Sequence, residues 1–127
     1  MQATLEHANI TVSDPAKTAK WLCDVFGWKI RWQGEAINGG HTVHVGDKTS
    51  YLALYLPPKA PDAPVSTYTT RGGLNHVAVV VDDLDAVEAR IRAAGFKTGS
   101  HADYEPGRRF YFDAEDGIEF EVVSYSG

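Results

Sequence analysis

Two histidines and one glutamate have the chemistry of ligands for a divalent metal ion. His7 lies in the segment LEHANITV, His76 lies in LNHVAVVV, and Glu121 lies near the end of the sequence. Imidazole nitrogens and a carboxylate oxygen suit Fe²⁺, Mn²⁺, Zn²⁺, Co²⁺ or Ni²⁺. Three protein ligands leave coordination positions open, and open positions are where a substrate or water is polarised. The alternative is that all three are ordinary strand residues with solvent or hydrogen-bonding neighbours.

An internal repeat places the two histidines at equivalent positions. The segment that begins at Leu5 parallels the segment that begins at Leu74, and His7 matches His76 without a gap. In each copy an alternating run rich in Val and Ile indicates a strand, and an apolar stripe at helical spacing follows it. Three short strand candidates come next. The predicted fold is therefore α+β, with two βαβββ modules that form a concave sheet bearing a cleft.

The boundaries of these elements follow from capping residues and apolar runs. Helix starts are marked by Ser13 or Asp14 and by Asp82 or Asp83, and helix ends by Gly27 and Gly95. The later strands are expected at 28–33, 41–46 and 50–56, and again at 96–100, 108–113 and 118–124. Within one domain of residues 1–127, module one spans about 4–57, a proline-rich linker about 58–72, and module two about 73–125. We expect the linker to be an ordered crossover.

Strand parity sorts the candidate residues by face, because alternate side chains of a strand point to opposite sides of its sheet. In both first strands the apolar set should lie under the helix, which leaves His7 and His76 on the concave face. In the last strand, burial of Phe120 and Val122 beneath the helix would put Glu121 on that same face. The matching strand of the first half presents its concave positions as Tyr51, Ala53 and Tyr55.

Composition excludes several classes of function. The formal net charge of −5 leaves no basic stripe for nucleic acid. No window approaches the eighteen apolar residues of a membrane span, and MQATLEHANI lacks a signal-peptide pattern, so a cytoplasmic protein without membrane partners is expected. Cys23 is the single cysteine, so an internal disulfide is impossible. Because Cys23 lies at helical spacing, it is interpreted as a packing residue rather than a nucleophile.

Three segments resemble the signature strands of the vicinal oxygen chelate superfamily: LEHANITV, LNHVAVVVDD and FYFDAEDGIEFEVV. This superfamily includes glyoxalases, extradiol dioxygenases, methylmalonyl-CoA epimerases, fosfomycin-resistance thiol transferases and bleomycin-sequestering proteins. The resemblance extends from Thr4 to Tyr125 and implies that His7, His76 and Glu121 bind metal. Ala53 replaces the fourth ligand usual in glyoxalases and epimerases. The set is therefore closer to the three-ligand pattern of the dioxygenases and thiol transferases.

The resemblance also implies catalytic groups beside the ion. The predicted catalytic residues are Tyr55, His44 and Arg109, with His41, His101, Tyr104 and Tyr111 as further acid or base candidates. Parity should turn only one of Arg108 and Arg109 inward, where a guanidinium can clamp a carboxylate, phosphonate or enolate. Each of these side chains has an alternative role as a surface or hydrogen-bonded residue.

The function expected from this resemblance is that of a metal-dependent enzyme that binds a small substrate through vicinal oxygens. Dioxygenase-like and glyoxalase-like or lyase-like reactions both fit, and the identity of the metal stays open. The alternatives are a metal-free protein that sequesters a drug or metabolite, like the bleomycin-resistance proteins, and a regulatory subunit. A homodimer is expected, and the cleft can form within one chain or by exchange of modules between two.

Overall fold

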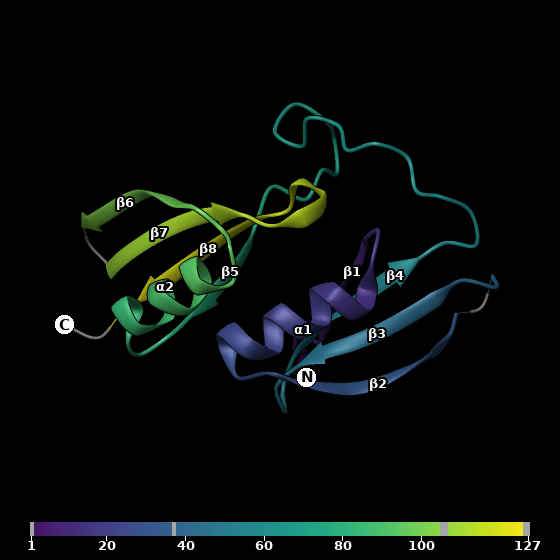
Figure 1. The fold of residues 1–127 in the computed structure, drawn as a ribbon, viewed down its shortest axis with the longest axis horizontal. Helices are drawn as coiled ribbons and strands as arrows, with labels where there is room; N and C mark the ends of the chain where they lie inside the picture. The colour runs from purple at the N-terminus through teal and green to yellow at the C-terminus, as the bar shows by residue number, and fades with distance from the viewer. Residues whose placement is uncertain (1, 37, 105–106, 126–127) are drawn as a thin grey trace. The chain divides into compact units, whose positions relative to one another are not determined.

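The repeated sequence pattern produces two units of the same construction (Figure 1). The computed structural model describes residues 2–36, 38–104 and 107–125. Unit 1 is Met1–Asp62 and unit 2 is Ala63–Gly127. Each holds a four-stranded mixed sheet with one α-helix against it, so the α+β prediction of two βαβββ modules is confirmed. None of the described helices has the length and apolar character needed to cross a membrane.

Unit 1 begins with the strand that carries His7. Its elements are β1 (His7–Thr11), α1 (Pro15–Phe26), β2 (Lys29–Glu35), β3 (His41–Gly46) and β4 (Tyr51–Leu56). The sheet order is β1-β4-β3-β2, with β1 parallel to β4 and the other pairs antiparallel. The register places His7 opposite Tyr51 and His44 opposite Ala53. These cross-strand neighbours define the face that the helix leaves uncovered.

Capping residues set the limits of α1 as the sequence predicts. The Asp14 carboxylate accepts a hydrogen bond from the Lys17 backbone N–H at 3.1 Å, and Pro15 occupies the first turn. Gly27 ends the helix with a φ of 71°, a left-handed conformation that favours glycine. Between these caps, a buried stripe that includes Leu22 and Val25 packs on the sheet. The helix thereby covers one face of unit 1.

Unit 2 repeats this order. Its elements are β5 (Val77–Val80), α2 (Leu84–Ala93), β6 (Thr98–Tyr104), β7 (Gly107–Asp113), the short 3₁₀ helix η1 (Glu115–Gly117) and β8 (Glu119–Ser124). The sheet order is β5-β8-β7-β6, with β5 parallel to β8. The Asp83 carboxylate caps α2 through the Ala86 N–H at 3.0 Å. Helix α2 contacts β6 and β8, above the buried rings of Phe110 and Phe120.

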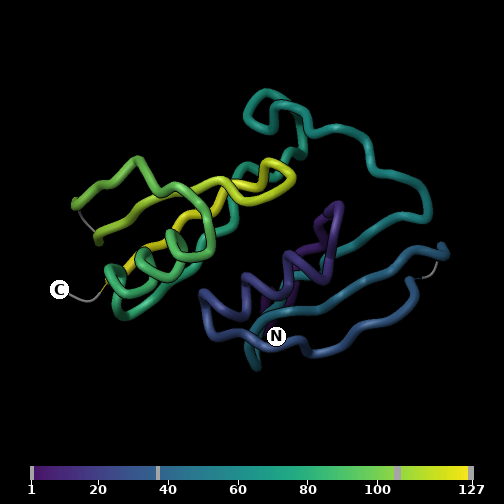
Figure 2. The backbone as a smooth tube through the Cα atoms, viewed as in Figure 1, coloured from purple at the N-terminus to yellow at the C-terminus, as the bar shows by residue number. Residues whose placement is uncertain are grey.

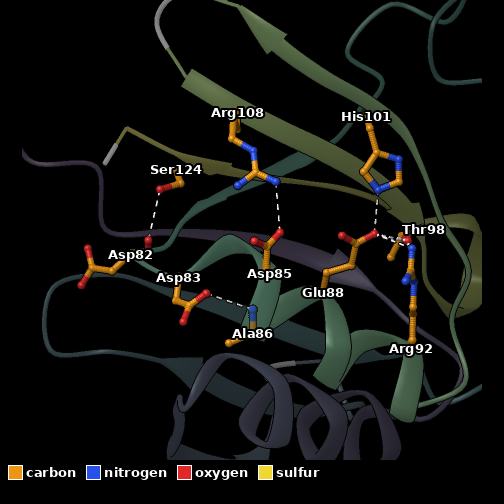
Figure 3. A network of polar contacts seen from close by, with 10 residues as sticks. All are labelled: Asp82, Asp83, Asp85, Ala86, Glu88, Arg92, Thr98, His101, Arg108 and Ser124. Carbon is orange, nitrogen blue, oxygen red and sulfur yellow. Dashed lines mark hydrogen bonds and ion pairs between the residues drawn. The ribbon is translucent and has the colours of Figure 1, made fainter. Parts of the chain in front are cut away.

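A polar network ties α2 to its sheet at several points (Figure 3). One oxygen of Glu88, on α2, accepts bonds from Thr98 Oγ1 at 2.5 Å and Arg92 Nη2 at 2.8 Å, and lies 2.6 Å from His101 Nε2. Thr98 and His101 both belong to β6. Because their partner is a largely buried carboxylate, these bonds hold the helix against the edge strand.

Most strands lie within two residues of the expected ranges, and the largest difference is at β6. Strand β6 starts at Thr98 and continues to Tyr104, whereas it was expected over 96–100. Its register shifts between Gly99 and Ala102, where Ser100 has a φ of 52°. A bulge of this kind inserts residues into a strand without interrupting it. Strand β5 starts at Val77, so His76 lies just before it.

The segment between β4 and β5 contains a folded turn, visible in the loop of Figure 2. The Thr70 hydroxyl donates to the Ser66 carbonyl at 2.5 Å, and the Gly73 N–H donates to the Thr70 carbonyl at 3.0 Å. A side chain at Gly73 would collide with the Thr67 backbone, so the turn needs a glycine there. These bonds form a local turn within residues 66–73, and the ordered crossover stays a prediction.

Candidate functional site

Unit 2 brings two of the three predicted metal ligands together. Glu121 lies on the central strand β8, between Ala78 of β5 and Tyr111 of β7. His76 Nε2 lies 3.3 Å from Glu121 Oε1. Phe120 and Val122, which flank Glu121, are 1% and 0% exposed, as expected for the strand positions beneath the helix. The predicted facial parity of Glu121 is therefore confirmed.

The second oxygen of Glu121 is held by a guanidinium. Arg109 Nη1 donates to Glu121 Oε2 at 2.9 Å, and Arg109 Nη2 donates to the Gly107 carbonyl at 3.4 Å. The guanidinium also lies over the Tyr104 ring, 4.8 Å from its centroid. Burial would lower the pKa of Arg109, but the hydrogen bond to Glu121 and its charge raise it. Arg109 therefore stays cationic and orients the carboxylate.

The other nitrogen of His76 has its own partners. His76 Nδ1 lies 3.4 Å from Glu119 Oε1 and 3.4 Å from the Tyr68 hydroxyl. The Tyr68 hydroxyl in turn donates to Glu119 Oε1 at 2.5 Å, and this bond raises the pKa of Tyr68 to about 12. Tyr111 meets His76 edge-on, with ring centroids 5.8 Å apart. The imidazole is thus fixed on one side by Glu119 and faces Glu121 with the other.

Unit 1 carries a hollow of about 590 Å³ on the face of its sheet that the helix does not cover. The lining is His7, Asn9, Trp32, Glu35, Ala36, Asn38, Thr42, His44, Tyr51, Ala53 and Tyr55. The predicted concave positions in this unit are therefore confirmed. Thr42 Oγ1 is buried and has no hydrogen-bond partner within the described residues. A buried hydroxyl without a hydrogen-bond partner can form a hydrogen bond with an oxygen or nitrogen of a bound molecule.

A cluster of rings surrounds His7 in this hollow. The centroid of Tyr51 lies 4.7 Å from that of His7 and 4.5 Å from that of His44. His7 Nδ1 bonds Glu6 Oε1 at 2.8 Å, and the Tyr51 hydroxyl donates to the same oxygen at 3.4 Å. Burial lowers the pKa of His44, and the neighbouring side chains of His7 and Arg31 lower it further. His44 is therefore held in the neutral form that can accept a proton.

The structure separates the remaining candidates by face. Arg109 turns toward Glu121. Arg108 donates to Asp85 of α2 at 3.0 Å (Figure 3). The prediction of a single inward arginine is therefore confirmed. His101 bonds Glu88 of α2 and lies outside both groups just described. Tyr55 lines the hollow of unit 1. Ala53 also lines the hollow and is 2% exposed, so the position where the resemblance places a fourth ligand holds a methyl group.

Sequence reasoning missed several residues of these groups, and four of them make contacts or carry a buried hydroxyl that bears on the site. These four are Glu6, Thr42, Tyr68 and Glu119. Glu119 has the same strand parity as Glu121, which is a signal that could have identified it. Tyr68 comes from the expected linker, where no periodicity points to a partner.

The predicted metal triad would take one donor from unit 1 and two from unit 2. In the part of the chain that the structure describes, no three His, Cys, Asp or Glu side chains are grouped so that they could hold an ion. His76 and Glu121 form a pair within unit 2, and His7 lies in unit 1 with its Nδ1 bound to Glu6. The shared triad stays a prediction.

Comparison with known proteins finds a family whose sequence profile matches this chain. The sequence profile described as the Glyoxalase/Bleomycin resistance protein/Dioxygenase superfamily matches residues 4–122. The uncharacterized protein YaeR of Escherichia coli (strain K12) is 26% identical over 131 residues, which cover 93% of each chain.

Solved structures show the same fold. A glyoxylase/bleomycin resistance protein/dioxygenase domain from Frankia sp. EAN1pec is 21% identical, with a TM-score of 0.82 and 98% of each chain covered. A mutant of the fosfomycin resistance protein FosX from Listeria monocytogenes is 19% identical, with a TM-score of 0.72, and the match covers 97% of this chain and 93% of that one. That structure is complexed with Mn(II) and 1S,2S-dihydroxypropylphosphonic acid.

Proposed function

Because the chain belongs to the glyoxalase/bleomycin resistance protein/dioxygenase superfamily, we propose that it is an enzyme that uses a divalent metal ion held by His7, His76 and Glu121. Its substrate is a small molecule that presents two neighbouring oxygens to the ion. The observation that carries this proposal is the 3.3 Å separation of His76 Nε2 and Glu121 Oε1 on the helix-free face of unit 2.

The residues present fit such an ion. Nitrogen and oxygen ligands bond Zn²⁺ at about 2.1 Å, so two ligands of one ion lie roughly 3 Å apart. The separation of His76 Nε2 and Glu121 Oε1 is close to that value. Glu119 lies at the opposite nitrogen of His76, where metal-binding histidines usually have a carboxylate or carbonyl partner. When bound, the ion would supply Lewis-acid polarisation of a substrate oxygen.

The side chains around these donors can bind and orient the substrate. Arg109 keeps a positive charge beside Glu121 and favours an anionic group nearby. In unit 1, the rings of Trp32, Tyr51 and Tyr55 offer apolar surface to a flat molecule, and neutral His44 can take a proton from it.

The number of protein ligands sets how many coordination positions stay open in the proposed site. Ala53 supplies no fourth donor, so the proposed site keeps open positions for two substrate oxygens or for one oxygen and a second reactant. The FosX structure, with Mn(II) and a dihydroxy phosphonic acid, is a relative with ligands of this kind. Extradiol dioxygenase-like chemistry and lyase-like or glyoxalase-like chemistry both remain within the proposal.

Metal stoichiometry tests the proposal directly. Elemental analysis after reconstitution with Fe²⁺, Mn²⁺, Zn²⁺ or Ni²⁺ should find about one ion per chain. His76→Ala and Glu121→Ala should remove most of the bound ion. His41→Ala is the matched control, because His41 is exposed on β3 and does not line the hollow. A wild-type protein that retains far less than one ion per chain would contradict the proposal.

A metal-free binding protein is the second candidate, and the hollow of unit 1 favours it. A volume of about 590 Å³ lies within the range of small-molecule pockets. Titration calorimetry with a panel of catechols, with and without EDTA, separates the two functions. The enzyme proposal expects binding that EDTA abolishes, followed by oxygen consumption if the ion is iron. Binding that EDTA leaves unchanged supports sequestration.

A further inference from the structure

A second hollow of unit 1 lies where α1 ends and β2 begins. Its volume is about 470 Å³. The residues that line it define the basic hollow, and they are Gly27, Lys29, Ile30, Arg31, Gly46, Asp47 and Lys48. None of them lines the hollow of about 590 Å³, and none is a predicted metal ligand. The proposed metal chemistry therefore makes no use of the basic hollow.

The basic hollow gathers positive charge in an acidic protein. Its lining holds three cationic side chains, those of Lys29, Arg31 and Lys48, and all three residues are exposed. The whole chain, by contrast, has a formal net charge of −5. Within the described residues, no ion pair joins any of these three cations to a carboxylate. Their charge is thus available to an anion from solution.

The turn between β3 and β4 uses the one carboxylate of the basic hollow, that of Asp47. Asp47 Oδ1 accepts hydrogen bonds from the Ser50 N–H at 3.0 Å, the Thr49 N–H at 2.8 Å and the Thr49 hydroxyl at 3.0 Å. These bonds, that from Ser50 first, lower the pKa of Asp47. The carboxylate therefore stays ionised and bound to its own turn. With three cations against it, the hollow keeps a surplus of two positive charges.

Strand pairing brings two of the cations to the same end of the sheet. Lys29 lies opposite Gly46 in the pairing of β2 with β3, and Lys48 follows Gly46 by two residues, in the turn. A side chain at Gly46 would collide with the Ser50 carbonyl and with Tyr51, so this strand end needs a glycine. The two lysines thus come from neighbouring strand ends with no side chain at position 46.

Arg31, the third cation, lies at a bulge of β2. The register of β2 against β3 shifts between Ile30 and Trp32, so Arg31 has no partner across the pair. A bulge changes the direction of the side chain that it carries. Arg31 Cζ lies over the Tyr51 ring, 4.4 Å from its centroid. A ring contact of this kind uses none of the five N–H donors of a guanidinium, so Arg31 can keep it and still donate to an anion.

We propose that the basic hollow binds a small phosphate monoester, independently of the proposed metal site. A phosphate monoester group carries a charge of about −1.5 to −2 at pH 7 and three acceptor oxygens, which matches the surplus charge and the three donor side chains. A guanidinium binds two oxygens of such a group at once, whereas each lysine acts as a point charge. The hollow is larger than a phosphate group alone. Ile30, which is 46% exposed, offers apolar surface to the carbon part of the ester.

Titration calorimetry of the full chain with n-butyl phosphate tests this site. EDTA should be present throughout, so that a metal ion cannot contribute, and the ionic strength should be low because salt screens exposed charges. One ester should bind per chain, inorganic phosphate should bind more weakly, and n-butanol should not bind. Arg31→Gln, Lys29→Gln and Lys48→Gln should each weaken binding by roughly 5-fold to 10-fold, because each removes a charged donor. The combined variant should not bind the ester.

Lys59→Gln is the matched control, because it removes the same charge from an exposed lysine outside the basic hollow. It should leave the affinity within about 2-fold of wild type, since a distant exposed charge is screened. An equal loss in Lys59→Gln would indicate general attraction to positive charge and overturn the proposal. Absence of binding to the wild type, or unchanged binding by the combined variant, would overturn it as well.

Amide NMR spectra then locate the bound ester. Shifts on addition of n-butyl phosphate should be concentrated in residues 27–31 and 46–50, which form the basic hollow and its turn. Shifts concentrated elsewhere in the chain would overturn the site. Equal affinity for inorganic phosphate and n-butyl phosphate would overturn the assignment of an ester, because Ile30 would then contribute nothing.

Discussion

Arg108 and Arg109 are consecutive in β7 and have opposite surroundings. The Arg109 side chain is 13% exposed and pairs with Glu121, which is 10% exposed. The Arg108 side chain is 51% exposed and pairs with Asp85, which is 74% exposed. A buried charge that loses its partner is costly, whereas an exposed ion pair contributes little. The alternation of the strand therefore separates a buried arginine, paired with Glu121, from a surface arginine.

Substitution of the two arginines should show this difference. Arg109→Met leaves Glu121 buried without its cation, and we expect the melting temperature to fall by roughly 5 °C or more. Arg108→Met should change it by about 1 °C at most. Differential scanning calorimetry measures both. If Zn²⁺ binds beside Glu121, saturating Zn²⁺ should restore more stability to Arg109→Met than it adds to the wild type. Equal melting temperatures for the two variants would contradict the structural role of the buried pair.

Strand parity was enough to predict on which face of its own sheet each candidate residue lies. It placed His7 and Glu121 opposite their helices and turned a single arginine inward. It could not predict that Glu119 and Tyr68 contact His76, because such contacts depend on side-chain rotamers and on the path of an aperiodic segment. The unpartnered hydroxyl of Thr42 likewise becomes visible only when its neighbours are known.

At the scale of elements, the carboxylate of Glu88 joins α2 to β6 through its contacts with Thr98 and His101 (Figure 3). Burial alone would raise its pKa, but bonds from Thr98 and His101 and the charge of Arg92 lower it below the ordinary 4.5. When folding lowers the pKa of a carboxyl group, the ionised group stabilises the fold. This stabilisation is complete at pH values above the ordinary pKa of the group. The contribution is lost as the pH falls through the folded-state pKa.

Glu88→Gln should therefore destabilise the protein in a pH-dependent way. Near neutral pH we expect the free energy of unfolding to fall by about 2 kcal/mol, because several bonds to a charged acceptor are weakened. As the pH drops below 4.5, the ordinary pKa of the group, the difference from wild type should shrink. Urea denaturation across this range measures the difference. A difference that stays constant with pH would show that the carboxylate charge is not what holds α2.

Gly27 allows a test of the helix end. With a φ of 71° it adopts a conformation that costs other residues energy, although no atom would obstruct a side chain there. Gly27→Ala should lower the free energy of unfolding by about 1 kcal/mol. Gly99→Ala is the control, since Gly99 also has open space but no positive φ. Its effect should be less than about 0.5 kcal/mol. Similar losses in both variants would point to a cause other than backbone strain.

The elements themselves were largely predictable from local patterns. Asp14 and Asp83 cap the helices as expected, because each lies immediately before an apolar stripe at helical spacing. The full course of β6 was not predictable, because the positive φ at Ser100 creates a bulge at a residue with no turn signature of its own. Backbone irregularities of this kind depend on pairing with the next strand rather than on periodicity.

At the scale of the whole molecule, the predicted metal ligands belong to both units. His7 comes from unit 1, whereas His76 and Glu121 come from unit 2. The linker between the modules leaves two ways to complete the triad, either within a chain or between two chains of a homodimer. The two arrangements predict different Zn²⁺ binding when chains that lack different ligands are mixed.

A mixture of two variants that each lack one predicted metal ligand distinguishes these possibilities. His7→Ala and His76→Ala chains, each lacking one ligand, should be unfolded together and refolded as a mixture. If the triad forms between two chains, mixed dimers contain one intact site and one doubly damaged site, so Zn²⁺ binding reappears. Exchange of modules within a homodimer requires this recovery, measured against each variant refolded alone. Absence of recovery, with dimers present by light scattering, would assign the triad to a single chain.

The fluorescence of Trp32 can report whether a molecule occupies the hollow of unit 1. Its indole is 51% exposed at the hollow of unit 1, and its ring centroid lies 5.1 Å from that of His44. Trp21, on α1, is 6% exposed, and Trp28 is half-buried, so these two indoles contribute a steady background. A molecule that fills the hollow would take the Trp32 indole out of water, so its emission should shift to shorter wavelength or be quenched. Compound libraries can therefore be screened by intrinsic fluorescence without labels, and Trp32→Phe should abolish the response.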